Sequence, residues 1–72
     1  MMQTQSDRSP ITDRQLEILQ LAADGLSNRE ICQKLYIALG TTKTHFRGIL
    51  ERLEANDRGH AIAIGFRVGL LR

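Results

Sequence analysis

Cysteine, proline and aromatic residues are scarce in this sequence. Its 72 residues include one cysteine, one proline, one tyrosine, two phenylalanines and no tryptophan. A single cysteine excludes an internal disulfide and any site held by several thiolates. No apolar run is long enough to span a bilayer, and no signal-peptide pattern is present. We therefore expect a soluble, cytoplasmic chain without a membrane segment.

Catalytic patterns are absent as well. His45 and His60 lie far apart on different predicted helices, and neither has a metal-ligand partner three or four residues away. Glu51 and Glu54 share a predicted solvent side, which makes a solvated face a simpler interpretation than an acid pair. The glycines occur singly, without a phosphate-binding loop. We predict neither an enzyme nor a cofactor or metal site.

Length and composition fit one small globular domain, with 42% hydrophobic and 25% charged residues. The formal net charge is only +2, but it is unevenly placed. Residues 1–40 carry four basic and five acidic side chains, a net charge of −1, whereas residues 41–72 carry six basic and three acidic ones, a net charge of +3. This weak asymmetry favours a polyanionic partner for the second half.

Hydrophobic periodicity predicts four helices and no strand, which gives an all-α domain over residues 11–72 after a flexible arm at residues 1–10. Thr12 is a suitable N-cap for a first helix over residues 13–23. The dipeptide Asp24-Gly25 is a stop signal at its end.

A second helix over residues 28–35 begins at the capping-box pattern Ser27-x-x-Glu30. After a short break at residues 36–40, the stretch Thr41–Ala55 predicts a longer third helix. A short capped helix, a tight turn and a longer helix form a helix-turn-helix, in which the third helix would be the recognition helix.

The third helix separates an apolar stripe from a polar, partly basic face. At 100° per residue, its core side carries Phe46, Ile49, Leu50 and Leu53. Its outer side carries Thr44, Arg47, Gly48 and Glu51, with Lys43 at the edge. Most charged faces are merely solvated, but behind a helix-turn-helix such a face can lie in a DNA groove, where Lys and Arg reach guanine edges and phosphates.

A fourth helix is predicted from Arg58 to Leu70, with Asn56 or Asp57 as its cap. One apolar stripe covers the first and third helices and consists of Ala61, Ile64, Gly65 and Val68. A second stripe consists of Ile62, Phe66 and Gly69. The second stripe either completes a small core or meets the same stripe of another chain. We favour a two-fold dimer, because so small a domain has little left to bury it.

The order and spacing of many residues resemble the LuxR/GerE-type DNA-binding domain of bacterial transcription regulators, from about Ile11 to Leu71. In the first half the matching residues are Thr12, Arg14, Glu17, Ile18, Leu19, Gly25, Leu26, Ser27, Asn28, Arg29, Glu30 and Ile31. In the second half they are Leu35, Ile37, Thr41, Lys43, His45, Ile49, Arg52, Leu53, Arg58 and Ala61. The resemblance implies sequence-specific DNA binding that regulates transcription.

The resemblance also implies roles for single residues. The base-reading positions are Lys43, Thr44 and Arg47, and the phosphate-contacting ones are Asn28, Arg29, Thr41, His45, Arg52 and Arg58. Packing is an equally good interpretation of His45, and a salt bridge to Glu54 or Asp57 competes for Arg52 and Arg58. A dimer interface of Ile62, Gly65, Phe66 and Gly69 would set two recognition helices roughly 34 Å apart on a near-palindromic site.

Several positions depart from the family pattern. Gln15 stands where glutamate is usual, which removes at most a surface ion pair. Cys32 replaces alanine, and a buried hydrophobe is a better interpretation than a redox switch. Ala38 replaces a capping serine, so we expect Thr41 to cap the third helix and the start of that helix to be loose without DNA. Thr42 replaces an inner valine, and we predict that its hydroxyl bonds a carbonyl one turn back.

The leading prediction is a regulator that binds double-stranded DNA as a homodimer, with RNA polymerase as a further candidate partner. It is either a free-standing regulator of the GerE kind, which the Met1 start favours, or the output domain of a longer one. The alternative is a small helical protein-interaction module that uses the helix-turn-helix as a scaffold. Steep weakening of binding with salt would distinguish DNA binding from an apolar protein contact.

Overall fold

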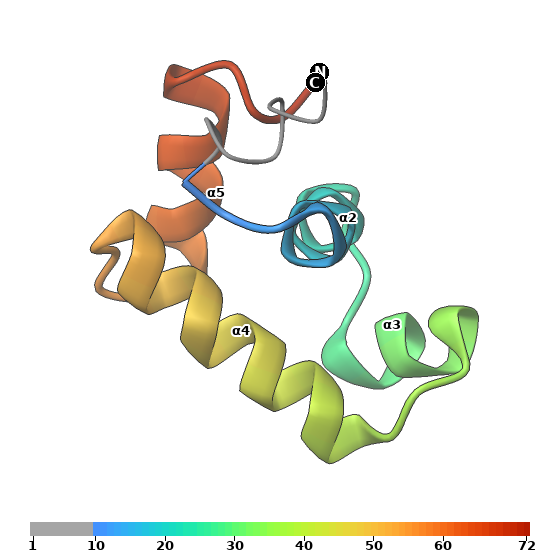
Figure 1. The fold of residues 1–72 in the computed structure, drawn as a ribbon. Helices are drawn as coiled ribbons and strands as arrows, with labels where there is room; N and C mark the ends of the chain where they lie inside the picture. Colours follow the sequence, from blue (N-terminus) through green and yellow to red (C-terminus); the bar gives the residue numbers. More distant parts are fainter. Residues whose placement is uncertain (1–9) are drawn as a thin grey trace, which may run out of the picture.

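The computed structural model describes residues 10–72. Within them the chain forms four helices and no strand, labelled as in Figure 1: α2 (Asp13–Ala23), α3 (Asn28–Leu35), α4 (Leu39–Leu53) and α5 (Arg58–Arg67). The predicted all-α, four-helix architecture is confirmed. The expected arm at residues 1–10 lies outside the described residues, apart from Pro10.

Helices α2 and α3 have the predicted bounds because each begins at a strong local signal. The Gln15 N–H donates to Thr12 Oγ1 at 3.1 Å, and the Thr12 N–H donates to Gln15 Oε1 at 2.9 Å. Ser27 and Glu30 form the same reciprocal pair at 3.1 and 2.8 Å. Each pair satisfies two backbone N–H groups that have no partner within the helix. Gln15 is therefore a buried capping residue and not the surface position we expected.

Helix α4 departs from the prediction at both ends. It begins at Leu39, two residues before the predicted start, and ends at Leu53, two residues before the predicted end. Its N-cap is Ala38, which makes no side-chain capping hydrogen bond. The expectation that Thr41 caps this helix is wrong, because Thr41 already lies inside it.

The inner side of α4 carries the core of the domain. Three of its residues are buried there: Thr42, Phe46 and Ile49. The apolar stripe predicted the burial of Phe46 and Ile49. The Thr42 hydroxyl is directed at the carbonyl of Ala38 at 3.4 Å, which confirms the predicted partner one turn back. This bond gives a fully buried hydroxyl an acceptor, so Thr42 can replace an aliphatic residue at this position.

Helix α5 starts at Arg58 as predicted, because Asp57 Oδ1 accepts the His60 N–H at 2.8 Å. It ends at Arg67, three residues before the predicted end. Gly69 has φ +83, and the N–H groups of Leu70 and Leu71 both donate to the Gly65 carbonyl, at 2.8 and 3.1 Å. This left-handed glycine turns the chain back over the helix that it has just left.

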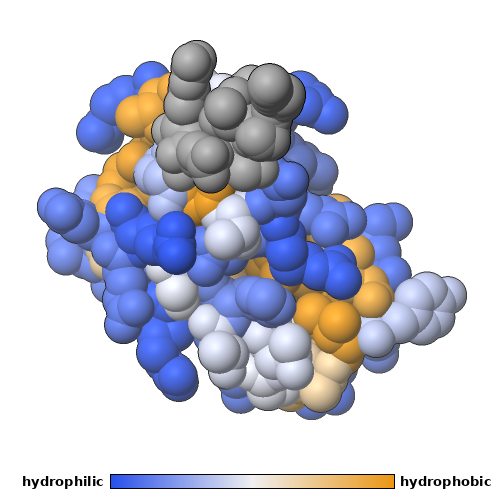
Figure 2. Space-filling model, in the orientation of Figure 1, coloured by the Kyte–Doolittle hydropathy of each residue, from blue (hydrophilic) through white to orange (hydrophobic). Residues whose placement is uncertain are grey.

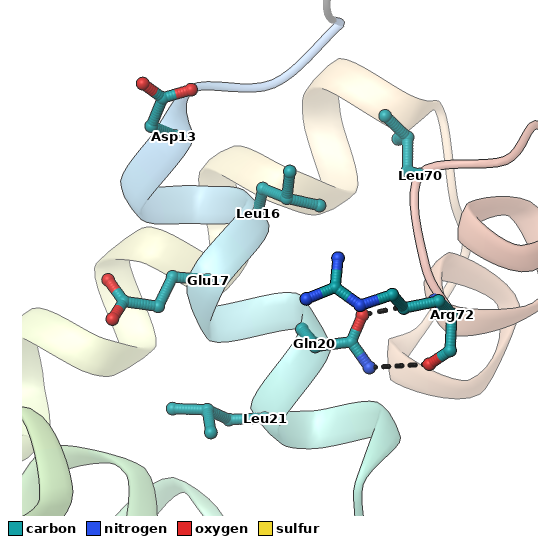
Figure 3. A pocket seen from close by; sticks show the side chains of 7 residues that line it. All are labelled: Asp13, Leu16, Glu17, Gln20, Leu21, Leu70 and Arg72. Atoms are coloured by element: carbon teal, nitrogen blue, oxygen red, sulfur yellow. Dashed lines mark hydrogen bonds between the residues drawn. The ribbon is translucent and has the colours of Figure 1, made fainter.

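The returning C-terminal tail completes the core. Leu71 is buried against Gly65, where an added Cβ would lie 2.6 Å from Leu71 Cδ1. The tail is also tied to α2, because Gln20 accepts the Arg72 N–H at 3.2 Å and donates its own amide to the Arg72 carbonyl at 3.0 Å (Figure 3). The largest fully buried apolar side chains are Ile11, Ile18, Leu19, Ile31 and Ile49.

The helices surround this core so that α4 lies along one side of the molecule. Helix α4 contacts each of the other three. In Figure 1, α3 lies beside the first half of α4 and α5 beside its end, with α2 between them. One long side of α4 therefore remains uncovered. Among residues 10–72, no helix combines the length and the apolar character needed to cross a bilayer.

Candidate nucleic-acid interface

The uncovered side of α4 presents the residues predicted to read bases. Lys43, Thr44 and Arg47 are all exposed. Among residues 10–72 the single ion pair is Arg14–Glu17, so neither Lys43 nor Arg47 has its charge neutralised by a neighbouring carboxylate. In the view of Figure 2, the surface over most of α4 is hydrophilic or of intermediate hydropathy, and hydrophobic surface is visible beside α3 and near α5. Such a face can approach a polyanion without desolvating apolar groups.

Thr44 contributes its methyl group to this face. Its hydroxyl donates to the Gly40 carbonyl at 3.0 Å, one turn back in the same helix. A donor used in this way is no longer available to a ligand, whereas the methyl group has no role inside the helix. The threonine is therefore suited to an apolar contact such as a thymine methyl.

Gly48 was predicted on the outer side of α4, and the structure corrects this. An added Cβ at Gly48 would lie 2.7 Å from Gln15 Nε2 of helix α2. The glycine is half-buried under that amide and is a point of close helix approach. The same Gln15 caps α2 through its oxygen, so one side chain both begins α2 and lies against α4 at Gly48.

Three more α4 residues were predicted to contact phosphates. Thr41 and Arg52 are exposed, and His45 is half-buried. The competing salt bridge from Arg52 to Glu54 or Asp57 is not formed, since the described residues hold no ion pair at these positions. Arg52 therefore has a free charge near the C-terminal end of α4.

The start of α3 supplies Asn28 and Arg29. Arg29 is exposed and without an acidic partner in the described part of the chain. Asn28 is half-buried, and its Oδ1 accepts a hydrogen bond of 2.6 Å from Arg58 Nη1. The two neighbouring positions thus differ: one side chain is free and the other is held by the fold.

The Arg58 guanidinium forms its contacts with groups inside the domain and not with a surface carboxylate. Besides its bond to Asn28, its Nη2 donates to the Leu26 carbonyl at 2.6 Å. Its Cζ lies 4.7 Å from the centroid of the Phe46 ring, which is a cation–π arrangement. The predicted alternative, a salt bridge to Glu54 or Asp57, is not formed. Sequence reasoning missed these contacts because the partners lie 30 and 32 residues away along the chain.

The start of α4 has unfilled hydrogen-bonding capacity. No side chain caps it, and no acidic residue lies in its first turn. The first N–H groups of a helix have no partner within the helix, and they carry the positive end of its dipole. An anion placed there would accept hydrogen bonds from these N–H groups and would be attracted by the positive end of the dipole.

The predicted dimer surface on α5 is only partly available. Phe66 is 50% exposed, and Ile62 is half-buried against the core. Gly65 is buried beneath Leu71, and Gly69 forms the left-handed turn. The inner stripe also needs correction, because Val68 is 58% exposed. Of the predicted set only Gly65 is buried, so Ile62 and Phe66 are the side chains left to face a second chain, beside the exposed turn at Gly69.

A hollow of about 390 Å³ lies elsewhere, between α2 and the C-terminal tail (Figure 3). Its lining includes the carboxylates of Asp13 and Glu17 and the apolar side chains of Leu16 and Leu70. No residue of α4 lines this hollow, so it does not belong to the candidate interface. In the described part of the chain, no three histidine, cysteine or acidic side chains gather as metal ligands would. Cys32 is buried, with its Sγ directed at the Arg29 carbonyl at 3.1 Å, as expected of a small core residue.

Comparison with known proteins points to one family. Residues 9–64 match the family described as "GerE: Bacterial regulatory proteins, luxR family". The transcriptional regulatory protein DesR of Bacillus subtilis (strain 168) is 46% identical over 57 residues, which cover 79% of this chain and 29% of DesR. The response regulator protein VraR of Staphylococcus aureus (strain Mu3 / ATCC 700698) is 42% identical over 62 residues, which cover 86% of this chain and 30% of VraR.

Two solved structures have the same fold. The structure of the transcription factor GerE superposes with a TM-score of 0.85 at 32% identity, covering 90% of this chain and 97% of GerE. The response regulator ChrA of a heme-sensing two-component system superposes with a TM-score of 0.81 at 38% identity, covering 88% of this chain and 31% of ChrA. The chain thus spans nearly all of GerE but less than a third of the response regulators.

Proposed function

Since the chain belongs to the luxR family of bacterial regulatory proteins, which are DNA-binding transcription regulators and not enzymes, we propose that it reads a specific duplex sequence with α4 in the major groove. The observation that carries the proposal is the exposed set Lys43, Thr44 and Arg47 on the uncovered side of α4. An α-helix fits the major groove, where each base pair presents a distinct pattern of donors, acceptors and methyl groups.

The base contacts follow from the chemistry of the three side chains. Lys43 and Arg47 offer only donors and suit guanine O6 and N7, and the Thr44 methyl suits a thymine methyl. Arg47 lies one turn after Lys43, so the two reach different base pairs along the groove. The binding site is therefore expected to contain guanines at two nearby positions.

Phosphate contacts would surround this centre. Arg29, Thr41, His45 and Arg52 border the base-reading face, and the uncapped start of α4 offers backbone N–H groups. Each neutralised phosphate releases counterions, which makes affinity fall steeply with salt. Contacts of this kind fix the register of α4 without reading sequence.

The dimer part of the proposal rests on Ile62 and Phe66. A half-exposed phenylalanine beside a partly buried isoleucine is a small apolar surface that a second copy would cover by two-fold symmetry. The two recognition helices would then lie roughly 34 Å apart and call for a near-palindromic site. The protein would act in the bacterial cytoplasm, where it meets DNA and, as a candidate partner, RNA polymerase.

The test begins with selection of bound sites from a random duplex library. Arg47→Ala and Lys43→Ala are each expected to weaken binding to the selected site by roughly 1–3 kcal/mol and to relax preference at one base position. Arg67→Ala is a matched control, since it removes an equal charge from an exposed position on α5. Equal losses on selected and random DNA would contradict base reading by α4. Absence of salt-dependent binding to duplex DNA would instead favour the protein-interaction module.

A further inference from the structure

Arg58 lies where three helices meet, and its guanidinium spans the N-cap of one of them. It is the first residue of α5, and its two terminal nitrogens donate to Leu26 O and Asn28 Oδ1, both at 2.6 Å. These acceptors stand on either side of Ser27, the N-cap of α3. The Phe46 ring of α4 lies 4.7 Å from the guanidinium carbon. One side chain therefore joins the starts of α3 and α5 to the middle of α4.

Only arginine can make this arrangement. Its donors form a rigid planar fork, and here two of its nitrogens reach two acceptors on the residues that flank Ser27. A lysine would carry the same charge on a single nitrogen and could not present two fixed donors with a flat face toward Phe46. Arg58→Lys therefore separates the charge of this residue from its geometry.

Electrostatics alone would not place a cation here. Arg58 begins α5 and contacts the start of α3, and a helix start carries a positive partial charge that a cation opposes. The hydrogen bonds and the aromatic contact must offset that repulsion. The guanidinium adds positive charge beside Asn28 and Arg29, in a corner that also holds the capping carboxylates of Glu30 and Asp57.

The Arg58 guanidinium also fixes the orientation of the Asn28 side-chain amide. A guanidinium has donors and no acceptor, so Asn28 must offer its oxygen to Arg58, which leaves its NH2 group directed elsewhere. Within residues 10–72, no buried side-chain nitrogen or oxygen lacks a partner. The Asn28 NH2 group makes no hydrogen bond to another described residue, and it is not fully buried. It is a fixed donor with a free face.

We propose that Arg58 is a positioning residue for DNA binding, which holds the Asn28 amide so that its NH2 group donates to a phosphate oxygen and keeps this donor in register with α4 through Phe46. The inference rests on the proposed function and refines it. It replaces a direct phosphate contact by Arg58 with an indirect role through Asn28. Arg29, exposed on the next position, remains a direct charge contact.

The decisive experiment compares Arg58→Lys, Arg58→Gln and Asn28→Ala on the selected duplex across a series of salt concentrations. Positioning predicts that both Arg58 variants and Asn28→Ala weaken binding by a similar factor, roughly 3- to 10-fold for one lost hydrogen bond. Arg58→Lys should leave the slope of log affinity against log salt unchanged. A direct phosphate contact would instead leave Arg58→Lys near the parent affinity, and Arg58→Gln would lower the slope by about one unit.

Coupling between the two residues gives a second readout. In an Asn28→Ala background, Arg58→Lys should cost little more, because the donor that Arg58 positions is already gone. Full additivity would overturn the proposal. Arg52→Lys and Arg52→Gln are the matched control pair on an exposed arginine, where the charge alone should matter. There the lysine variant should bind like the parent and the glutamine variant should lower the slope.

Stability is measured in parallel by urea unfolding, and binding is compared only where every variant is folded. If Arg58→Lys lowers stability but the folded protein binds DNA like the parent, the role of Arg58 is purely structural and the proposal is wrong. Asn28→Ala serves as an independent test, since it leaves the Arg58–Leu26 bond in place. If Asn28→Ala bound the duplex with the affinity of the parent protein, the positioning proposal would also be wrong. If the unsubstituted protein itself bound no duplex DNA, the proposed function would fail instead.

Discussion

The starts of α3 and α4 both belong to the proposed DNA-facing surface, but they are built in opposite ways. The start of α3 is held by the reciprocal bonds of Ser27 and Glu30 and by the fork of Arg58. The start of α4 has Ala38 as its N-cap, no side-chain capping bond, and Gly40 in its first turn. One start is completed by the chain itself, and the other leaves its N–H groups to solvent or to a ligand.

This difference separates two ways of preparing a contact with DNA. A fixed start presents its donors in one geometry and loses little entropy on binding. An uncapped start is less stable locally, and a phosphate could supply the missing hydrogen bonds. We expect α3 to set the position of the domain on the backbone, and the first turn of α4 to become ordered when α4 enters the groove. Four measurements test this contrast.

The largest effect is expected from Ser27→Ala. Removing this hydroxyl breaks the capping box of α3 and should lower the free energy of unfolding by about 1–2 kcal/mol. Thr41→Ala is the matched control, because it removes an exposed hydroxyl from the first turn of α4 without removing a cap. It should change stability by less than about 0.5 kcal/mol. Equal losses in urea unfolding would mean that the two starts do not differ as described.

Amide exchange compares the two starts without any substitution. Ile31 and Thr42 are both fully buried, and each N–H donates to the carbonyl of its own N-cap, at 2.9 and 3.1 Å. With no DNA present, the Thr42 amide should exchange about 5- to 10-fold faster, the equivalent of one missing cap. Equal protection at the two amides would remove the evidence for a loose start of α4.

Supplying the missing cap should make the two starts more alike. Ala38 has φ −70 and ψ 150, an extended conformation that suits a capping residue. Ala38→Ser is therefore expected to raise the free energy of unfolding by about 1 kcal/mol and to slow exchange at Thr42. Ala38→Val is the control, since it adds bulk without a capping oxygen. A gain of the same size from valine would show that packing, not capping, is responsible.

The smallest effect is expected from Gly40→Ala. Nothing lies within 4 Å of an added Cβ at Gly40, and the residue is helical, so alanine should raise stability by about 0.5–1 kcal/mol. Gly25→Ala is a matched control, because its Cβ would also meet empty space, but its φ is +102. That substitution should lower stability. If both variants shift the unfolding midpoint in the same direction, backbone conformation does not explain the effect.

The sequence predicted best the elements that carry their own boundary signals. Helices α2 and α3 have the expected bounds because Thr12 and Ser27 act on residues three positions away. The start of α4 was misplaced because no capping side chain marks it. The end of α5 was misplaced because Gly69 was read as a packing residue, whereas it forms the turn that brings Leu71 back.

The exposure of the three residues proposed to read bases was predictable from periodicity, but the tertiary contacts that hold the neighbouring residues were not. Lys43, Thr44 and Arg47 follow from the spacing of α4 and from the family resemblance. The bonds of Arg58 join segments about 30 residues apart, and helix periodicity carries no information on such pairs. Gly65 was predicted on the inner stripe, but periodicity could not show that the returning Leu71 would cover it. Local patterns thus identify which residues face outward, and tertiary contacts decide how firmly they are held.

Gly48 lets α4 pass close to the Gln15 side chain of α2, because a side chain at this position would force that amide to move. Gly48 lies nine residues beyond Leu39, so a tilt of about 5° at this point would move the start of α4 by about 1 Å, given a rise of roughly 1.5 Å per residue. Hydrogen bonds to base edges tolerate displacements of only about half that. If α4 reads bases as proposed, the precision of those contacts would depend in part on a residue without a side chain, on the core-facing side of the helix.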